Sequence, residues 1–246
     1  PVHLYGQAAN MEAIMQIAEK YQLYVVEDNA QAIGCTVTFT NGEKKKTGTI
    51  GHIGCTSFYP SKNLGAFGDG GAICTNDDDL ADKMQMIANH GQSRRYYHDV
   101  VGCNSRLDSI QAAILNVKLK HLDVYNAARQ KVAAYYDQAF SGNKKIITPI
   151  TAAFTNHVYH QYTLKLNNVD RDGLVAFLAD KKIPAMIYYP VPGHRQKMFA
   201  HFKTEQQDMP VTDWLTERVI SLPIHTEMDE EQLQYITHSV LEFVNQ

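Results

Sequence analysis

Apolar residues recur at helical spacing near the start of the chain and then give way to a short apolar run. The helical spacing covers residues 11–21, and Asn10 stands where an N-cap is expected. The run Leu23-Tyr24-Val25-Val26 follows directly and predicts a strand. Near-continuous apolar strands are typical of parallel sheets that helices cover on both faces. The opening of the chain therefore predicts half of a βαβ unit.

The next part of the chain predicts a hairpin and two more strands. Segments 37–39 and 47–50 flank Asn41-Gly42, a dipeptide that favours tight hairpin turns, and the lysine run 44–46 is expected at the tip. Such a run is more often a solvated surface than an anion site. An apolar strand is expected to lead into Lys62. A strand at 72–75 and a helix capped by Asn76 or Asp77 are expected after it.

The second half of the chain mixes helical and alternating patterns. Apolar positions at helical spacing run from Asp108 to about Phe140, which predicts one long helix or two helices joined at a kink. Beyond it we expect a strand at 157–166 and helices at 172–182 and 229–244. This order predicts a larger domain over residues 1–140, which includes the connecting helix, and a smaller α+β domain over residues 141–246.

Composition is that of an ordinary globular protein. The 246 residues are 44% hydrophobic with a formal net charge of −3, which indicates neither nucleic-acid nor membrane-surface binding. No apolar run approaches the roughly 20 residues of a membrane-spanning helix, and the start does not resemble a signal peptide, so we expect a cytoplasmic protein. The four cysteines form no Cys-x-x-Cys pair, and no His/Glu spacing marks a metal site. Pro1 cannot be a natural initiator, so a further N-terminal portion is expected.

A carboxylate and an amine are predicted at the carboxyl ends of neighbouring strands. Asp28 follows the first apolar strand and Lys62 follows the second. Pyridoxal phosphate chemistry requires these two groups, because the amine forms a Schiff base with the cofactor aldehyde and the carboxylate pairs with the protonated ring nitrogen. The glycines after Lys62 lack the spacing of a dinucleotide site, and Tyr59 stands too close to Lys62 for a short-chain dehydrogenase. The pattern favours a pyridoxal phosphate enzyme.

Five motifs occur in the order seen in the DegT/DnrJ/EryC1/StrS sugar aminotransferases. They are residues 1–6, 27–32, 57–64 and 102–107, and Tyr189-Pro190-Val191-Pro192 with His194. The chain resembles this family over nearly its whole length. The resemblance implies an α/β fold like that of aspartate aminotransferase (fold type I), with a large mixed-sheet domain and a small α+β C-terminal domain. It also implies a homodimer whose active sites lie at the interface.

The resemblance assigns five residues to the cofactor, pyridoxal 5'-phosphate. Lys62 matches the Schiff-base lysine, Asp28 the partner of the pyridine nitrogen, and Gln31 the residue beside the ring hydroxyl. Ser57 matches a phosphate contact, and Asn104 matches a residue that reaches the phosphate from the neighbouring subunit. The family's phosphate loop and ring-stacking aromatic are expected in the N-terminal portion that precedes this chain.

Three further residues are candidates for substrate binding. Arg106, two positions after Asn104, is a candidate for the charged part of the substrate, and Tyr188 and His194 come from the Pro-rich stretch of the second half. A hydrogen-bonded structural histidine is an equally good interpretation of His194. His157 and His160 are interpreted as strand positions rather than ligands.

The resemblance implies transfer of an amino group from L-glutamate to a nucleotide-diphosphate-linked keto sugar. The sugar 3-dehydratases of the family carry histidine at the position of Lys62, so the lysine favours transamination. Two alternatives stay open: a related lysine-bearing enzyme, such as a dehydratase like the aminohydroxybenzoate synthases, and a regulatory protein that binds without turnover. The nucleotide, the sugar and the carbon that receives the amine depend on pocket loops whose shape the sequence does not define.

Overall fold

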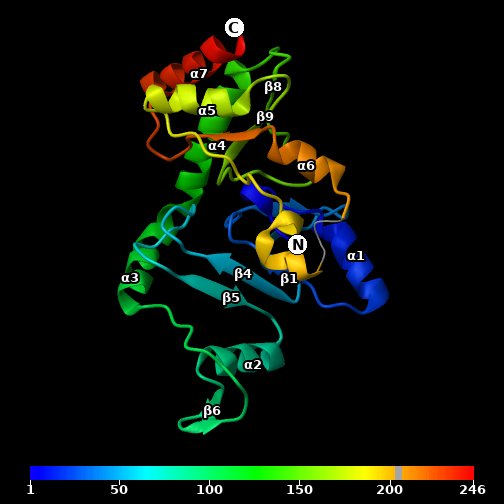
Figure 1. Ribbon diagram of the computed structural model, residues 1–246. Helices are drawn as coiled ribbons and strands as arrows, with labels where there is room; N and C mark the ends of the chain where they lie inside the picture. Colours follow the sequence, from blue (N-terminus) through cyan, green and yellow to red (C-terminus); the bar gives the residue numbers. More distant parts are fainter. Residues whose placement is uncertain (203–206) are drawn as a thin grey trace. The chain divides into compact units, whose positions relative to one another are not determined.

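The computed structural model describes residues 1–202 and 207–246, which form two compact units (Figure 1). The first unit comprises residues 1–127 and 151–160, and the second comprises residues 128–150 and 161–246. Helix α4 (Leu122–Ala139) contributes residues to both units. The functional domain boundary expected at residue 140 stays a prediction.

A three-stranded mixed sheet in the order β1-β4-β5 forms the centre of the first unit (Figure 1). Strand β1 (Val26–Asp28) pairs in parallel with β4 (Ile53–Ser57), and β5 (Gly71–Cys74) pairs antiparallel with β4. Asp28 stands opposite Cys55, so the carboxyl ends of β1 and β4 lie side by side, as the sequence predicted. The strand predicted at 23–26 was wrong in its bounds, because pairing begins only at Val26.

Helix α1 (Met11–Tyr21) begins at the predicted cap. Asn10 Oδ1 accepts a hydrogen bond from the Ala13 N–H at 3.2 Å. Met11 and Ala18 are buried in a cluster with Val25 and Val37. The apolar spacing of residues 11–21 does not give a fully buried face, since Ile17 and Tyr21 are 56% and 61% exposed. Before α1, a short 3-10 turn, η1 (Leu4–Gly6), follows His3.

The predicted hairpin is present in a different register. Strand β2 (Thr36–Thr38) pairs with β3 (Lys44–Lys46), so the lysine run is a strand and not the hairpin tip. The reason lies in the turn: Gly42 N–H donates to the Phe39 carbonyl and Phe39 N–H donates to the Glu43 carbonyl, so pairing resumes directly after Glu43. The strand predicted at 47–50 is instead a turn.

Helix α2 (Asp78–Ala88) begins as predicted, with Asp77 Oδ1 accepting from the Leu80 N–H at 2.9 Å. A small hairpin of β6 (Gln92–Arg94) and β7 (Tyr97–His98) follows it, and the sequence did not predict it. Neither glycine nor proline marks the turn, because Tyr96 itself adopts a φ of 70°. The Arg94 guanidinium lies 3.7 Å from the centre of the Tyr97 ring.

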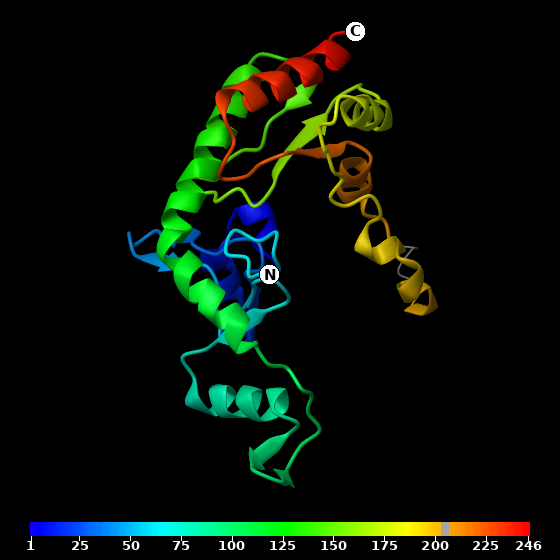
Figure 2. The same ribbon diagram turned by 90° about the vertical axis from the view of Figure 1, so that its left-hand side faces the viewer.

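Helix α3 (Ser109–Lys118), the 3-10 turn η2 (Leu119–His121) and α4 form a nearly continuous helical rod (Figure 2). The prediction of two helices joined at a kink is confirmed, and η2 is the joint. Leu115 and Leu122 are buried in a cluster with Leu64 and Ala66, which belong to the loop that follows β4. Among the described residues, no helix combines the length and apolar composition that a membrane crossing requires.

The second unit is built on an antiparallel sheet in the order β10-β9-β8. The strands are β8 (Ile146–Ile147), β9 (Tyr162–Leu166) and β10 (Val219–Leu222). Helices α5 (Arg171–Asp180) and α7 (Glu230–Val244) confirm two predicted helices, and a capping box of Asp229 and Gln232 begins α7. Shorter helical segments complete the unit: η3 (Gly193–Arg195), η4 (Lys197–Phe202) and α6 (Pro210–Thr216).

The strand predicted at 157–166 was wrong in its first half. Residues 157–160 belong to the first unit and do not form a strand. His157 is 5% exposed, its ring stacks on Tyr159 with centroids 3.9 Å apart, and its Nδ1 accepts from the Tyr159 N–H at 3.0 Å. This local contact turns the chain away from an extended course. Burial lowers the pKa of His157 to about 4.

The His157 environment predicts a loss of stability in acid. Because the folded-state pKa lies below the ordinary value of about 6.5, the fold favours the neutral ring. The stabilisation is complete above about pH 6.5 and is lost as the pH falls towards about 4, amounting to about 3 kcal/mol of unfolding free energy. Urea unfolding at several pH values should show this loss. His157→Asn should reduce the slope of the unfolding free energy against pH between about 4 and 6.5. Equal slopes for His157→Asn and for the exposed-site control His238→Asn would contradict the assignment.

Candidate active site

Strand β1 places two adjacent carboxylates on opposite faces of its sheet. Glu27 is fully buried, whereas Asp28 is exposed. Side chains alternate along a strand, and residues in register share a face, so Asp28 lies on the face of Cys55 and Glu27 on that of Gly54. The two carboxylates therefore serve different purposes.

Glu27 is anchored by four donors. Its carboxylate accepts from the N–H groups of Gly48 at 2.9 Å, Ile50 at 2.6 Å and Gly51 at 2.6 Å, and from His3 Nε2 at 2.9 Å. His3 Nδ1 accepts from the Ala9 N–H at 3.1 Å, so Nε2 carries the proton. Burial by itself raises the pKa of Glu27, but the His3 and backbone donors outweigh it, and the pKa is lowered. Glu27 is thus an ionised anchor that fixes β1.

Sequence reasoning did not single out Glu27 and His3 as a pair. Both residues stand within the motifs that carried the family resemblance, yet no local pattern indicates that they meet across 24 positions. One signal was present. A glutamate directly after an apolar run must find partners if the strand is buried, because a buried unpaired carboxylate is costly.

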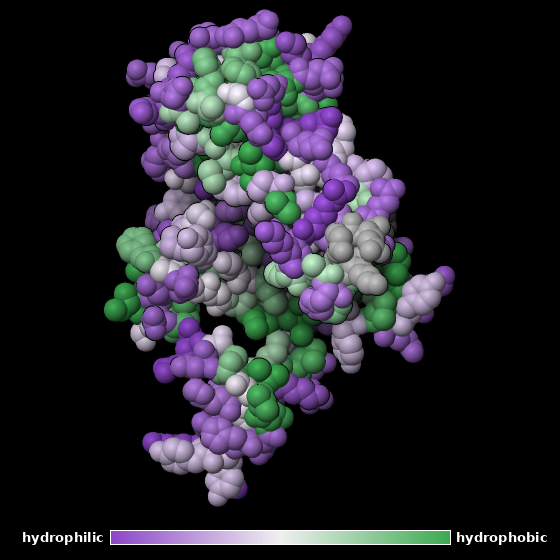
Figure 3. Space-filling view, viewed as in Figure 1, coloured by the Kyte–Doolittle hydropathy of each residue, from purple (hydrophilic) through white to green (hydrophobic). Residues whose placement is uncertain are grey.

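The end of β4 continues the face that Asp28 occupies. Ser57 stands two residues after Cys55 and so faces the same way. Its Oγ accepts from the Tyr59 N–H at 3.2 Å, where the chain leaves the strand. Val26 and Ile73 on this face are 50% and 55% exposed, and Figure 3 shows apolar atoms at the surface in the region of β1, β4 and β5. The face is open and partly apolar.

The loop after Ser57 folds back on itself and presents Lys62. Lys62 N–H donates to the Tyr59 carbonyl at 2.9 Å, and Ala66 N–H donates to the Phe58 carbonyl at 2.7 Å. Gly65 is required here, because a Cβ would lie 2.3 Å from the Pro60 carbonyl oxygen. Burial lowers the pKa of the half-buried Lys62 amine, and the charge of Asp28 partly offsets this by raising it. The two predicted groups therefore lie within electrostatic reach of each other.

Gln31 lies on the loop that follows Asp28. Ala30 N–H donates to Asp28 Oδ1 at 3.0 Å, which fixes the carboxylate at the end of the strand. Gln31 Oε1 accepts from the Tyr5 N–H at 2.6 Å, so η1 holds the loop. The structure thus gathers Asp28, Gln31, Ser57 and Lys62 around the carboxyl ends of two paired strands.

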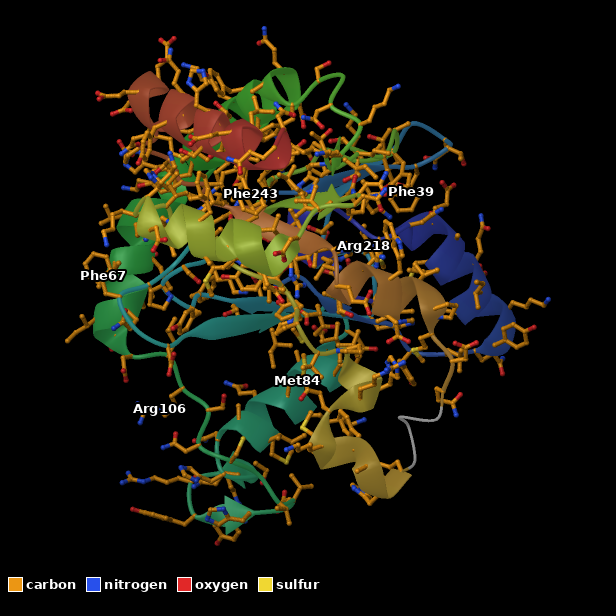
Figure 4. The ribbon with its side chains drawn as sticks, turned by 45° about the horizontal axis from the view of Figure 1, so that its top comes forward. Phe39, Phe67, Met84, Arg106, Arg218 and Phe243 are labelled. Atoms are coloured by element: carbon orange, nitrogen blue, oxygen red, sulfur yellow. The ribbon has the colours of Figure 1, made fainter. Side chains whose placement is uncertain are left out.

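Asn104 and Arg106 lie in another part of the first unit. Asn104 forms an isolated bridge with Asn89, the residue that ends α2, and Ser105 N–H donates to the Ala88 carbonyl at 2.9 Å. Arg106 is exposed on the segment that leads into α3 (Figure 4). Within the described part of the chain, no hydrogen bond or ion pair joins either residue to Asp28 or Lys62. Their assignments to cofactor and substrate stay predictions.

Tyr188 and His194 belong to the second unit. The Tyr188 ring packs edge-on against the Tyr189 ring, with the ring centroids 5.5 Å apart. His194 Nε2 accepts from Arg195 Nε at 3.3 Å and lies 3.8 Å from Asp213 Oδ1, and the His194 side chain is 7% exposed. These contacts support a structural interpretation of His194, while both substrate assignments stay predictions. Across residues 1–202 and 207–246, no group of three or more metal-ligating side chains comes together.

The chain matches the model of the DegT/DnrJ/EryC1/StrS aminotransferase family over residues 1–241. It is 47% identical over 236 residues to a UDP-N-acetyl-3-dehydro-alpha-D-glucosamine 3-aminotransferase of Acidithiobacillus ferrooxidans, covering 96% of this chain and 61% of that protein. It is 43% identical to a UDP-2-acetamido-2-deoxy-3-oxo-D-glucuronate aminotransferase of Pseudomonas aeruginosa, covering 96% and 63%. A third relative, a pleiotropic regulatory protein of Geobacillus stearothermophilus, is 46% identical, covering 99% and 64%.

Solved structures agree with the sequence comparison. The S. venezuelae protein DesV in complex with a ketimine intermediate aligns with a TM-score of 0.92 at 37% identity, covering 100% of this chain and 64% of that one. A Brucella abortus aminotransferase aligns at 0.89 and 37%, with the same coverage of 100% and 64%. The prediction of a mixed α/β fold of this type is confirmed, although the chain spans less than two thirds of the length of these relatives. The chain belongs to the DegT/DnrJ/EryC1/StrS aminotransferase family.

Proposed function

We propose that this chain is part of a pyridoxal-phosphate-dependent enzyme that moves an amino group from L-glutamate to a nucleotide-linked keto sugar. The observation that carries the proposal is the placement of Asp28 and Lys62 at the carboxyl ends of paired strands, with the amine half-buried. A carboxylate and an amine so arranged are the minimum that this chemistry asks of a protein.

The donor set fits pyridoxal phosphate. Asp28 offers a carboxylate for the ring nitrogen, Lys62 an amine for the aldehyde, and Ser57 a hydroxyl on the same strand face for the phosphate. Gln31, held by the Tyr5 N–H, offers an amide beside them. The open, partly apolar face with Val26 and Ile73 is suited to a flat aromatic ring. The ring nitrogen, the aldehyde and the phosphate of the cofactor would therefore each meet a chemically matched side chain.

Lys62 supplies the reacting nitrogen. When bound, pyridoxal phosphate supplies an aldehyde that accepts amines and a ring that takes up electrons. Because burial lowers its pKa, Lys62 Nζ is more often unprotonated near neutral pH than an exposed lysine, and a free amine can act as a nucleophile. The same nitrogen can later carry a proton between positions on the substrate. Asp28 offers its carboxylate at the end of the paired strand, where it would hold positive charge on the ring nitrogen.

The names of the relatives narrow the substrate. Two relatives above 40% identity are named for UDP-linked sugars with a keto group at carbon 3. We therefore propose a UDP-linked 3-keto sugar as the amino acceptor, with Arg106, Tyr188 and His194 as candidate substrate contacts. The homodimer, with Asn104 reaching the cofactor phosphate of a second subunit, and the division into a large and a small domain complete the proposal.

A regulatory role without turnover is the second candidate. It rests on the Geobacillus stearothermophilus relative, which is named a pleiotropic regulatory protein at 46% identity. Binding alone needs no amine that is held half-buried within reach of a carboxylate. The Asp28 and Lys62 arrangement therefore favours catalysis.

Catalysis is tested by amino transfer itself. We expect the full-length protein with pyridoxal phosphate, glutamate and a UDP-linked 3-keto sugar to form 2-oxoglutarate and the amino sugar, measured by chromatography. Lys62→Ala should lose about a thousandfold or more of this rate, because the variant lacks the amine that forms the Schiff base. Lys20→Ala, at an exposed position of α1, is the control and should keep full activity. A Lys62→Ala protein that retains substantial activity would remove the proposal, and a wild-type protein that binds but never turns over would favour regulation.

Replacement of Asp28 separates charge from shape. Asp28→Asn keeps the size of the side chain and the acceptor for the Ala30 N–H but removes the negative charge. We expect cofactor binding to persist and the rate of amino transfer to fall by about 100-fold, because the electrostatic stabilisation of the ring is lost. Asp69→Asn, at an exposed loop position, is the matched control. An unchanged rate in Asp28→Asn would show that Asp28 is only structural.

A further inference from the structure

The loop that carries Lys62 is attached to helices α3 and α4 by side chains. Gln111 Oε1 on α3 accepts from the Phe67 N–H at 2.8 Å, and Lys118 Nζ on α3 donates to the Gly65 carbonyl. Phe67 lies beside α3 in Figure 4. Asn63, the residue after Lys62, donates through Nδ2 to Asn126 Oδ1 on α4 at 2.7 Å. The helical rod therefore helps to define where Lys62 stands.

Asn126 makes a second bond in the opposite direction. Its Nδ2 donates to the Ile33 carbonyl at 3.1 Å, two residues after Gln31. One amide side chain thus joins the loop after β1 to the loop after β4, and these two loops carry Gln31 and Lys62.

The contact requires a glycine at position 34. Gly34 has a φ of +88°, and a Cβ there would lie 2.5 Å from Asn126 Nδ2. The missing side chain makes room for the amide, and the left-handed backbone turns the loop around it. Glycine here accommodates the close approach of Asn126.

Burial makes the amide pair rigid. Asn63 and Asn126 are each 6% exposed, so water has little access to replace a broken bond. Asn63 Nδ2 donates both to Asn126 Oδ1 and to the Val158 carbonyl at 2.9 Å, which uses both of its hydrogens. Asn126 accepts from one loop and donates to the other, so its orientation is fixed as well.

We propose that Asn126 is a positioning residue that sets the placement of the Lys62 loop relative to the loop carrying Gln31. The inference rests on the proposed function for the role of Lys62 as the reacting amine. Asn126 acts through Asn63 and Ile33 and does not itself touch reacting atoms. If the link is removed, Lys62 keeps its sequence neighbours but loses its partly buried position beside Asp28.

The test measures Lys62 directly in the full chain without cofactor. An amine-acylating reagent at low concentration reacts only with free amines, so the rate at Lys62 against pH gives the midpoint of its titration. Peptide mass spectrometry reports the rate, with exposed Lys20 as the internal standard for reagent. The midpoint does not depend on how readily the reagent reaches the amine. A role confined to stability would leave it unmoved.

The expected result is an upward shift of the Lys62 midpoint in Asn126→Ala. Burial lowers the pKa of Lys62, and a released loop would hydrate the amine. Gly34→Ala should shift the midpoint in the same direction, because its Cβ displaces the Asn126 amide. If Asn126→Ala does not fold, Gly34→Ala still tests the hydrogen bonds of Asn126 to the two loops. Val132→Ala, a buried α4 position at 4% exposure, is the control that loosens the helix packing and should leave the midpoint unchanged.

Equal midpoints in a folded Asn126→Ala protein and in Val132→Ala would overturn the proposal. The outcome is separable from the proposed function, because the measurement needs neither cofactor nor turnover. An inactive wild-type protein with a shifted Asn126→Ala midpoint would refute the function and keep the positioning role. An active wild-type protein together with an unshifted Asn126→Ala midpoint would keep the function and refute the positioning role.

Discussion

The buried carboxylate of Glu27 is the constraint on which the arrangement of the site depends. Four donors, three from the backbone of residues 48–51 and one from His3, converge on it beneath the sheet. A buried charge with this many donors tolerates little movement, because each lost bond would leave a polar group unpaired. Since β1 cannot shift or slip in register, Asp28 must project from the opposite face. Glu27 thus sets the position of Asp28, the carboxylate that we propose pairs with the cofactor.

Two opposing effects act on the amine that faces this carboxylate. Burial of Lys62 lowers its pKa and the charge of Asp28 raises it, and burial is the larger effect. With its pKa lowered by burial, the Lys62 amine is more often unprotonated and able to react, and the charge of Asp28 still attracts its protonated form. The balance depends on the loop geometry, and the contacts of Gln111, Lys118 and Asn126 show that the geometry comes from the helical rod.

Local signals in the sequence predicted the features that local contacts determine. The caps at Asn10, Asp77 and Asp229 are formed by side chains that bond within three residues, so helix starts were predicted correctly. Asp28 and Lys62 were found because each follows a strand and stands in a recognisable motif. The lysine run 44–46 was misplaced because the turn closes at Glu43, so the second strand begins at Lys44 and not at the predicted residue 47. The first half of the strand predicted at 157–166 did not form because His157 stacks on Tyr159 and the chain is not extended there.

The contacts that the sequence could not predict are those between distant segments. His3 with Glu27, Asn63 with Asn126, and Asn126 with Ile33 join positions separated by 24, 63 and 93 residues. The residues in these pairs are of ordinary types, and no local sequence pattern indicates which partner each of them contacts. These few contacts are important because they fix strand β1 and the two loops that carry Gln31 and Lys62.

We propose above all that Lys62 is the amine that binds pyridoxal phosphate. Incubation of the full-length protein with the cofactor, reduction with borohydride and peptide mapping by mass spectrometry would locate the attachment directly. We expect a single dominant pyridoxyl adduct on Lys62. An adduct on another lysine, or one spread over several surface lysines with none favoured, would contradict it.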